Sequence, residues 1–328
     1  MKYRQVHYAL EMLIILFVFL CGCSAKNIGE NEKEEDRCYD LEESGFDVSG
    51  QEEIYAIGDC LYYFDIGRGA LCSYDFSTES LDVLTEQIGR LWQAEEGLYY
   101  IVGQDVYEVA VDTLKFALSI PVTAEPIGSF GGTIYWMVHE IFEDELSQAE
   151  AYSLCKIYAQ NTEGEAVEPE LVYETNHNIT PGSILVGGKL CTANFSGIYV
   201  IDIETGIINH VVEQGNVGLF MQGGYVFAED NAEDLYQIDV EKNTVKKVIE
   251  MYETITVKDD VLYCWFGDEL LVQNMEGDVI AKKMVEQAQK KDGSFCSMAV
   301  CGSKVVWRNW LTEELYVYDM ETEEWELF

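Results

Sequence analysis

From Ile54 onward, short apolar runs alternate with turns, and this pattern recurs about seven times. Each unit starts with an apolar run, a tight turn and a tyrosine-rich run, as in Ile54–Tyr63. The turns fall at Gly58, Glu96, Gly131, Gly187, Gly223, Asp259 and Gly302, which gives spacings of 38, 35, 56, 36, 36 and 43 residues. A period near 40 residues with four strand-like runs per unit is typical of a β-propeller.

The fourth unit shows the four expected strands most clearly. Two strands flank a turn within Ile184–Ala193, a third covers Gly197–Asp202 and a fourth covers Ile207–Val212. Residues 54–328 therefore predict an all-β propeller of seven four-stranded blades, with six or eight blades as alternatives that the degenerate repeats leave open. The last unit contains all four of its strands, so we expect the ring to close without a strand borrowed from the N-terminus.

A second element recurs at the last hairpin of most units, where an Asp or Asn ends a strand. The residues concerned are Asp75, Asn161, Asp202, Asp239, Asn274 and Asp319. Such side chains accept hydrogen bonds from backbone amides two residues further on and thereby start a turn. Because the element repeats from blade to blade, we predict turn formation, with calcium binding as the alternative that the sequence leaves open. The sequence predicts neither a metal site nor another cofactor.

The N-terminus carries the pattern of an export signal. Lys2 and Arg4 precede the apolar run Met12–Leu20, which is too short to span a membrane comfortably. The segment Leu20-Cys21-Gly22-Cys23 resembles the lipobox of bacterial lipoproteins. This resemblance implies a lipoprotein signal peptide over residues 1–22 and a diacylglycerol on Cys23.

The lipid would anchor the chain to the cell membrane on its extracytoplasmic face. Cys21 and Glu11 depart from the usual lipobox pattern, so an uncleaved N-terminal anchor is the alternative. The following residues 24–53 contain eleven acidic and three basic side chains. Such a segment buries too little apolar surface to order itself. We therefore predict that residues 23–53 form a lipidated, acidic, flexible tether.

The charge of the whole chain narrows the range of partners. A formal net charge of −40 repels nucleic acid, so we expect no nucleic-acid partner.

Beyond Cys23 the chain has an even number of cysteines, which would allow disulfides in an exported protein. Several of them fall inside expected strands, so we predict free buried thiols, with Cys296–Cys301 as the best candidate for a bridge.

Catalytic motifs contribute little to the prediction. The chain contains no GxSxG, Walker, HExxH or GxGxxG motif, and few histidines. Carboxylates are so numerous that the sequence cannot locate a glycosidase pair among them. We predict no catalytic residue, although an enzyme stays open as an alternative.

The loops that join the second and third strands of each blade lie on the same propeller face as the links between blades. Exposed rings beside polar groups are what binding faces use. The candidate ligand-binding residues on these loops are Phe142, Phe195, Trp265, Phe266, Asp268, Arg308, Asn309 and Trp310. The alternative for each ring is that it packs between blades.

With Leu20–Cys23 and strand motifs such as Ile134-Tyr135-Trp136 and Leu98-Tyr99-Tyr100, the chain resembles propeller lipoproteins of bacterial envelopes. The strand motifs are similar to those of low-density-lipoprotein-receptor-type propellers, but the full Tyr-Trp-Thr-Asp motif is missing. We therefore transfer no binding residue from that class.

The leading hypothesis is a tethered, non-catalytic recognition or scaffold protein that binds an envelope protein or glycan through one propeller face. One alternative is an extracytoplasmic polysaccharide hydrolase or lyase with carboxylates near the central channel. Another is a structural subunit of an envelope complex. Substitution of Asp65, Asp230 and Asp268 would separate an enzyme from a binding protein.

Overall fold

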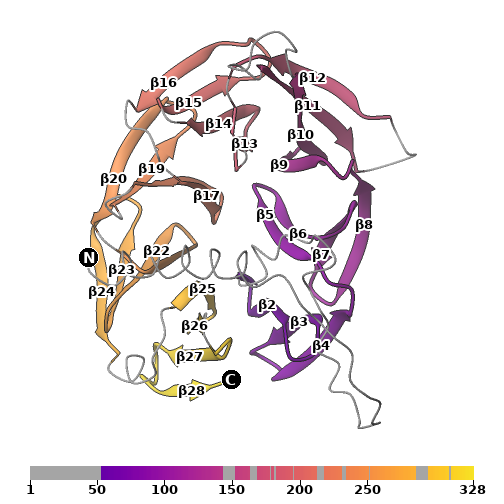
Figure 1. Cartoon of the computed structure of the whole chain (residues 1–328). Coiled ribbons are helices and arrows are strands. Elements are labelled where there is room, and N and C mark those ends of the chain that lie inside the picture. Colours follow the sequence, from indigo (N-terminus) through magenta and orange to yellow (C-terminus); the bar gives the residue numbers. More distant parts are fainter. Residues whose placement is uncertain are drawn as a thin grey trace, which may run out of the picture. The chain divides into compact units, whose positions relative to one another are not determined.

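In the computed structural model of the chain, seven β-sheets are arranged in a ring around a central axis (Figure 1). The structure describes residues 53–142, 152–162, 168–177, 179–180, 182–194, 196–212, 218–230, 234–250, 252–285, 295–309 and 312–328. The chain divides into two units, Met1–Asp47 and Val48–Phe328, and every described residue belongs to the second. Each sheet contains four antiparallel strands in sequence order, which confirms the prediction of seven four-stranded blades.

The first four blades follow one another along the chain. Blade 1 contains β1 (Ile54–Ile57), β2 (Cys60–Asp65), β3 (Ala70–Asp75) and β4 (Ser80–Thr85). Blade 2 contains β5 (Arg90–Ala94), β6 (Gly97–Val102), β7 (Asp105–Ala110) and β8 (Thr113–Ser119). Blade 3 contains β9 (Ala124–Phe130), β10 (Thr133–Phe142), β11 (Tyr152–Asn161) and β12 (Glu170–Thr175). Blade 4 contains β13 (Ile184–Val186), β14 (Lys189–Asn194), β15 (Gly197–Asp202) and β16 (Ile208–Val212).

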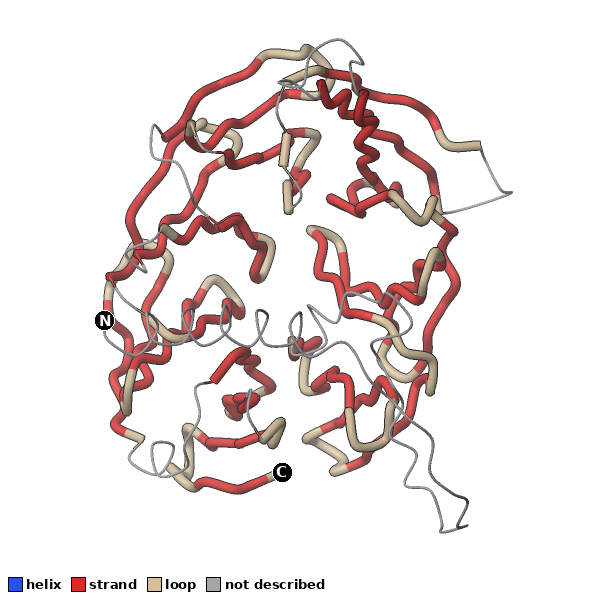
Figure 2. The backbone as a smooth tube through the Cα atoms, in the orientation of Figure 1, coloured by secondary structure: helices blue, strands red, loops and turns tan. Residues whose placement is uncertain are grey.

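The remaining three blades complete the ring. Blade 5 contains β17 (Gly218–Gln222), β18 (Tyr225–Glu229), β19 (Asp234–Asp239) and β20 (Thr244–Glu250). Blade 6 contains β21 (Thr254–Lys258), β22 (Val261–Phe266), β23 (Glu269–Asn274) and β24 (Val279–Met284). Blade 7 contains β25 (Phe295–Cys301), β26 (Lys304–Asn309), β27 (Leu315–Asp319) and β28 (Trp325–Leu327). Figure 2 shows that strands, in red, dominate the fold, and the described residues contain no helix.

The topology gives the ring two different faces. We call the turn face the side that carries the turns between the first and second strands and between the third and fourth strands of each blade. The loop face carries the loops between the second and third strands and the links between blades. The first strand of every blade lies nearest the axis, and the fourth forms the outer edge (Figure 1).

All seven turns between first and second strands are two-residue hairpin turns. In blade 3 the turn is Gly131-Gly132, and both residues have positive φ, at 59° and 67°. Blade 6 uses Asp259-Asp260 at 51° and 59°. A two-residue turn with positive φ at both positions matches the right-handed twist of the strands, which explains the choice of Gly and Asp. The turn positions predicted from the sequence are therefore confirmed.

The blades pack against each other through seven apolar clusters, one between each pair of neighbouring blades. Strand β2 shows how one strand serves two clusters. Leu61 and Tyr63 face blade 7, whereas Cys60, Tyr62 and Phe64 face blade 2. Because both sides of an inner strand are buried, the repeats appear in the sequence as continuous apolar runs and not as an apolar–polar alternation.

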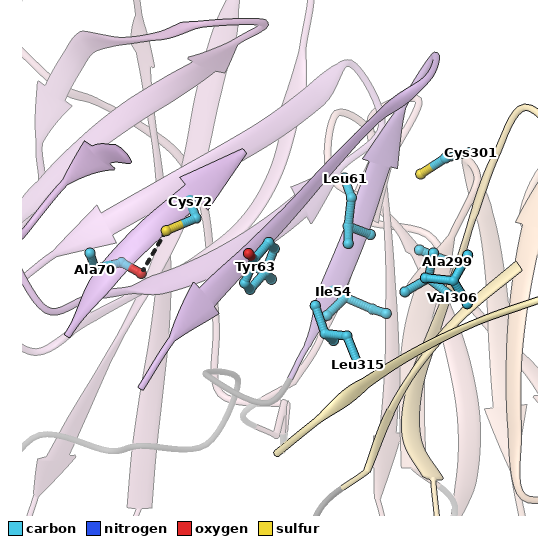
Figure 3. Packing of buried hydrophobic residues seen from close by; sticks show 10 residues of the cluster. Ile54, Leu61, Tyr63, Ala70, Cys72, Ala299, Cys301, Val306 and Leu315 are labelled. Atoms are coloured by element: carbon cyan, nitrogen blue, oxygen red, sulfur yellow. Dashed lines mark hydrogen bonds between the residues drawn. The ribbon is translucent and has the colours of Figure 1, made fainter. Parts of the chain in front are cut away.

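The ring closes by packing between blades 7 and 1, without exchange of a strand, as the sequence predicted. Figure 3 shows Ile54 and Leu61 of blade 1 close to Val306 and Leu315 of blade 7. The Ile54 amide also donates a hydrogen bond of 3.0 Å to Ser297 Oγ. At the periphery, the ring of Phe328 lies 4.4 Å from that of Tyr74, edge to face. Apolar and aromatic contacts therefore close the ring. In a propeller closed by strand exchange, one sheet would instead combine strands from both ends of the chain.

The third unit corrects one expectation from the sequence. Its spacing of 56 residues predicts a long acidic loop from His139 to Glu150. In the structure β10 continues to Phe142 and β11 starts at Tyr152, and each strand is ten residues long. The extra residues therefore lengthen the hairpin of blade 3, because His139 pairs with Cys155 in the ladder. Residues 143–151 lie outside the described part of the chain.

The predicted turn-forming role of the recurring Asp and Asn residues is confirmed for several blades. Asp75 Oδ1 accepts a hydrogen bond of 2.7 Å from the Ser77 amide, and Asp202 Oδ1 accepts one of 2.8 Å from the Thr205 amide. Asp239, Asn274 and Asp319 bond to the backbone of their turns in the same way.

The buried cysteines in the described part of the chain are free thiols, as predicted. Cys296 and Cys301 do not form a bridge. Burial raises the pKa of the Cys155, Cys191 and Cys264 thiols to about 12. These groups therefore stay protonated and behave as small apolar side chains.

Candidate binding groove on the loop face

The structure distributes the predicted binding residues over several environments. Trp265, Phe266 and Asp268 lie around the β22–β23 loop of blade 6, and Arg308 and Asn309 end β26 of blade 7. Phe142 ends β10, but its side chain lies outside the described residues, as do Phe195, Trp310 and the expected lipid attachment site Cys23.

Two neighbouring rings of blade 6 have opposite environments. Trp265 is fully buried, and its ring centroid lies 4.9 Å from that of Trp307, which belongs to blade 7. Trp265 therefore packs between blades, which is the alternative that the sequence left open. Phe266 is 48% exposed on the loop face, so its ring is accessible to a ligand.

Arg308 and Asn309 are both buried, and each one supports the local backbone. The Arg308 guanidinium donates a hydrogen bond of 3.0 Å to the Phe64 carbonyl oxygen, across the seam where the ring closes. Asn309 Oδ1 accepts a hydrogen bond of 3.0 Å from the Thr312 amide and so shapes the β26–β27 loop. Both side chains therefore support the β26–β27 loop from inside and offer little surface to a ligand.

A groove of ≈610 Å³ lies between blades 7 and 1 on the loop face. The β2–β3 loop forms one wall with Asp65, Ile66 and Arg68, and the β26–β27 loop forms the other with Glu313 and Glu314. Residues Tyr63, Phe64, Gly67, Leu81, Arg308, Thr312, Leu315 and Phe328 complete the lining. The volume lies within the range of sites for small ligands or for one segment of a larger ligand.

The groove combines both signs of charge with apolar surface. On one wall, Arg68 Nε lies 3.2 Å from Asp65 Oδ2, and the arginine side chain is about half exposed. On the other wall, Arg308 Nη2 lies 3.7 Å from Glu313 Oε2, and the Glu313 side chain is 40% exposed. Ile66 and Phe328 are also partly exposed. The groove therefore offers donors, acceptors and apolar contacts to one ligand at the same time.

The three aspartates chosen as probes of catalysis lie on the loop face in different settings. Asp65 pairs with Arg68 in the groove. Asp230 is buried and accepts a hydrogen bond of 3.1 Å from the Tyr236 hydroxyl. Asp268 is half-buried, and its Oδ1 has no hydrogen-bond partner in the described part of the chain. The structure thus places them in separate blades and not around one reacting centre.

Two of the described histidines pack against one tyrosine. The ring centroids of His177 and His210 lie 5.1 and 4.5 Å from that of Tyr199. Within the described ranges, no group of three or more His, Cys, Asp or Glu side chains could hold a metal ion. The same ranges contain no helix long and apolar enough to cross a membrane.

The sequence predicted part of this groove. Asp65 and Arg308 are among the residues it singled out, but it did not bring Asp65 and Arg68 together with Glu313 and Phe328. The available signal was topological, because the first and last repeats of a closed ring must be neighbours. The loops of repeats 1 and 7 are therefore expected to face each other, even though nearly the whole domain separates them in sequence.

No model of a known protein family and no curated protein sequence matches the chain. Solved structures do resemble it. An oligogalacturonate lyase from Vibrio parahaemolyticus has a TM-score of 0.53 at 11% identity, with 81% of this chain and 87% of the lyase covered. Pyrococcus horikoshii acylaminoacyl peptidase has a TM-score of 0.55 at 12% identity, with 84% of this chain and 51% of the peptidase covered.

The computationally designed Ika8 protein has a TM-score of 0.50 at 10% identity, with 82% of this chain and 95% of the designed chain covered. At such low identity these likenesses concern the fold alone. Together with the seven consecutive four-stranded sheets, they show that the described part of this chain is a seven-bladed β-propeller.

Proposed function

We propose that this protein is a recognition lipoprotein that binds an envelope protein or glycan in the groove between blades 7 and 1. The observation that carries the proposal is the groove itself, where the partly exposed side chains of Arg68 and Glu313 line a hollow that is also partly apolar. Planar arginine groups and rings are common anchors of binding surfaces, since they combine contact area with directed hydrogen bonds.

The construction of the groove supports this proposal. Arg308 and Asn309 fix the β26–β27 loop from below, so that Glu313 and Glu314 are held in place before a ligand arrives. Glu314 Oε2 accepts hydrogen bonds from the Thr312 hydroxyl at 3.0 Å and from the Tyr316 hydroxyl at 2.8 Å. A wall that is already ordered loses less conformational entropy on binding.

The proposal includes attachment to the membrane through Cys23. Its support is the lipobox-like Leu20–Cys23 and the acidic segment that follows. A fatty-acid label should enter the wild-type protein but not a Cys23→Ala variant, and the wild type should sediment with membranes. Equal labelling of both proteins would contradict lipidation at this residue.

Binding is tested with the full-length protein in membranes. Crosslinking and glycan-array binding would be compared for the wild type, a groove variant Arg68→Glu/Glu313→Lys and a control variant Lys242→Ala. Lys242 pairs with Asp239 on the turn face, so the control removes a charge far from the groove. We expect a partner that the wild type and the control retain and that the groove variant loses.

Retention of the same partner by the groove variant would overturn the proposed site. If no protein or glycan binds to either form, the recognition function itself is wrong. Polysaccharide turnover by the wild type, lost in a single Asp65→Asn or Asp268→Asn variant, would favour the hydrolase or lyase alternative. The array and the turnover assay use the same glycans, so one set of reagents separates these outcomes.

A further inference from the structure

A second hollow lies at the centre of the ring, apart from the groove. The inner strands enclose two adjoining cavities of ≈420 and ≈330 Å³, and Tyr55 and Gln93 line both. The larger cavity is lined by residues at the beginnings of inner strands, where the links between blades arrive, so it lies toward the loop face. Its volume falls in the range of small-molecule sites.

One side of this cavity is charged. Glu53 directly precedes β1, Arg90 is the first residue of β5, and Glu125 is the second residue of β9. They thus occupy similar positions in three consecutive blades. Glu53 accepts a hydrogen bond from the Tyr55 hydroxyl. Glu125 Oε1 accepts one of 2.8 Å from the Gly182 amide, and its Oε2 makes no hydrogen bond within the described ranges.

Arg90 differs from the other two arginines of the described chain. Arg68 pairs with Asp65, and Arg308 bonds to the Phe64 carbonyl oxygen. The half-buried Arg90 makes no hydrogen bond and no ion pair within 4 Å among the described residues, although its charge acts on the Glu53 carboxylate. A guanidinium carries five donors in a planar fork, which matches the two oxygens of a carboxylate. Arg90 is therefore the most available anion-binding group in the cavity.

The opposite wall of the cavity is apolar. It consists of Leu219, Phe220 and Met221 in β17 of blade 5, all of them half-buried. The Phe220 ring stacks on that of Phe227, with centroids 5.6 Å apart, so it is held in place. Gln93 lines the cavity between the two walls, and its buried Oε1 has no hydrogen-bond partner within the described ranges. The cavity therefore has a charged side and an apolar side.

We propose that this cavity binds a small zwitterion with an apolar body, the chemical class of the free apolar α-amino acids. Its carboxylate pairs with Arg90, its ammonium with Glu125 Oε2, and its apolar side chain contacts Phe220 in the apolar wall. A simple anion is disfavoured by the net charge of −40 and by the two neighbouring glutamates, whereas a zwitterion carries no net charge. This site is separate from the groove and does not depend on the proposed function.

The test is a calorimetric titration of the full-length protein with four ligands. L-phenylalanine carries both charges and a ring, 3-phenylpropanoate lacks the ammonium, 2-phenylethylamine lacks the carboxylate, and glycine lacks the ring. We expect L-phenylalanine to bind and each of the other three to bind roughly tenfold more weakly or worse, as is typical when a charge-assisted contact or a buried ring is lost. Equal binding by all four, or no binding by any at millimolar concentration, would overturn the proposal.

Variants assign the contacts. Arg90→Met removes the donors without breaking a hydrogen bond of the fold, and Glu125→Gln keeps an acceptor for the Gly182 amide while it removes the charge. Each should weaken L-phenylalanine binding roughly tenfold or more. The control Lys242→Met removes a positive charge on the turn face, far from the cavity, and should leave the binding unchanged. If Arg90→Met binds as the wild type does, the site is wrong. Circular dichroism checks the fold of each variant, and the ligand series on the wild type decides by itself should a variant unfold.

Discussion

The acidic residues on the two faces of this propeller differ in what surrounds them. On the turn face, carboxylates bind the protein's own backbone. Glu96 accepts hydrogen bonds from the Gly131 and Gly132 amides at 2.8 and 3.1 Å, and Glu95 accepts one of 2.9 Å from the Gly187 amide. The acidic residues there join the turns of different blades, so their negative charge is part of the construction.

On the loop face, the charged groups face hollows. Asp65 and Arg68 line the groove, and Arg90 and Glu125 line the central cavity. The loops that carry the groove are irregular in length, and they leave a hollow between blades 7 and 1. The comparison teaches that an acidic surface alone does not locate a site. The partners of each carboxylate decide whether it stabilises the fold or is available to a ligand.

The largest effect should come from rings that are buried just below the loop face. Trp307→Ala removes a fully buried ring that contacts both Trp265 and Trp325. Truncation of a buried Trp costs about 3–5 kcal/mol, which corresponds to a melting temperature lower by roughly 6–20 °C. Phe266→Ala, close by but exposed, should change it by no more than about 2 °C. Thermal unfolding followed by circular dichroism measures both.

Similar losses in the two variants would contradict this assignment of core and surface. Such a result would mean that Phe266 is as important to packing as Trp307. If the prediction holds, Phe266→Ala becomes a safe surface variant for binding experiments, whereas Trp265→Ala would confuse a binding defect with unfolding.

The fold could be predicted from the sequence because the information is local and repeated. A two-residue turn such as Gly131-Gly132 restricts the backbone by itself, and Asp75 or Asp202 starts its own turn with amides two or three residues away. Seven imperfect copies reinforce one another. The hairpin of blade 3 is the exception. His139 belongs to a polar segment that has no strand pattern, and yet it pairs with Cys155 and lengthens the ladder.

The candidate sites were less predictable, because they depend on contacts between distant residues. Nothing near Trp265 in sequence shows that Trp307 covers it, and nothing near Arg308 shows that the Phe64 carbonyl oxygen takes its hydrogen bond. The exposed fraction of a loop residue is set by the neighbouring blade. Arg90 belongs to no sequence motif, and only its position in the lining of the central cavity makes it a candidate binding residue.

A smaller effect is expected from the two arginines of the groove. Arg308→Met keeps most of the apolar stem but leaves the Phe64 carbonyl oxygen without its partner. A buried unsatisfied carbonyl costs about 1–3 kcal/mol, so the melting temperature should fall by roughly 2–12 °C. Arg68→Met should stay within about 2 °C of the wild type, because the half-exposed pair with Asp65 contributes little. An equal fall for both variants would show that Arg308 is not a special link between blades 7 and 1.

The carboxylate contacts of the turn face should each contribute less still. Glu96→Ala removes the acceptor of the Gly131 and Gly132 amides, and we expect a loss of about 0.5–1.5 kcal/mol in the free energy of unfolding. Glu96→Gln keeps one acceptor oxygen and should lose less. Glu108→Ala is the control, because Glu108 forms only an exposed ion pair with Lys115. Urea unfolding measures the free energy of unfolding of each variant. A loss in Glu108→Ala as large as that in Glu96→Ala would mean that removal of a negative charge, and not loss of the hydrogen bonds, lowers the stability.

The smallest effect concerns the turn aspartates and appears only in acid. Hydrogen bonds from Ser77 lower the pKa of Asp75 below its ordinary value of 3.8, and hydrogen bonds from Thr205 do the same for Asp202. A carboxyl with a lowered pKa in the folded state stabilises the protein fully above pH 3.8. This stabilisation is lost as the pH falls through the lower, folded-state pKa.

Protonation of the many other carboxylates relieves repulsion in a chain of net charge −40, which acts in the opposite direction. The contribution of the turns is therefore isolated by comparison with an Asp75→Asn/Asp202→Asn variant, whose amide oxygens still accept the backbone hydrogen bonds but do not titrate. Thermal unfolding between pH 7 and pH 3 should give similar melting temperatures for the two proteins at pH 7. Below about pH 4 the wild type should lose stability more steeply. Parallel curves down to pH 3 would mean that these aspartates shape the turns without contributing to the acid sensitivity of the turn face.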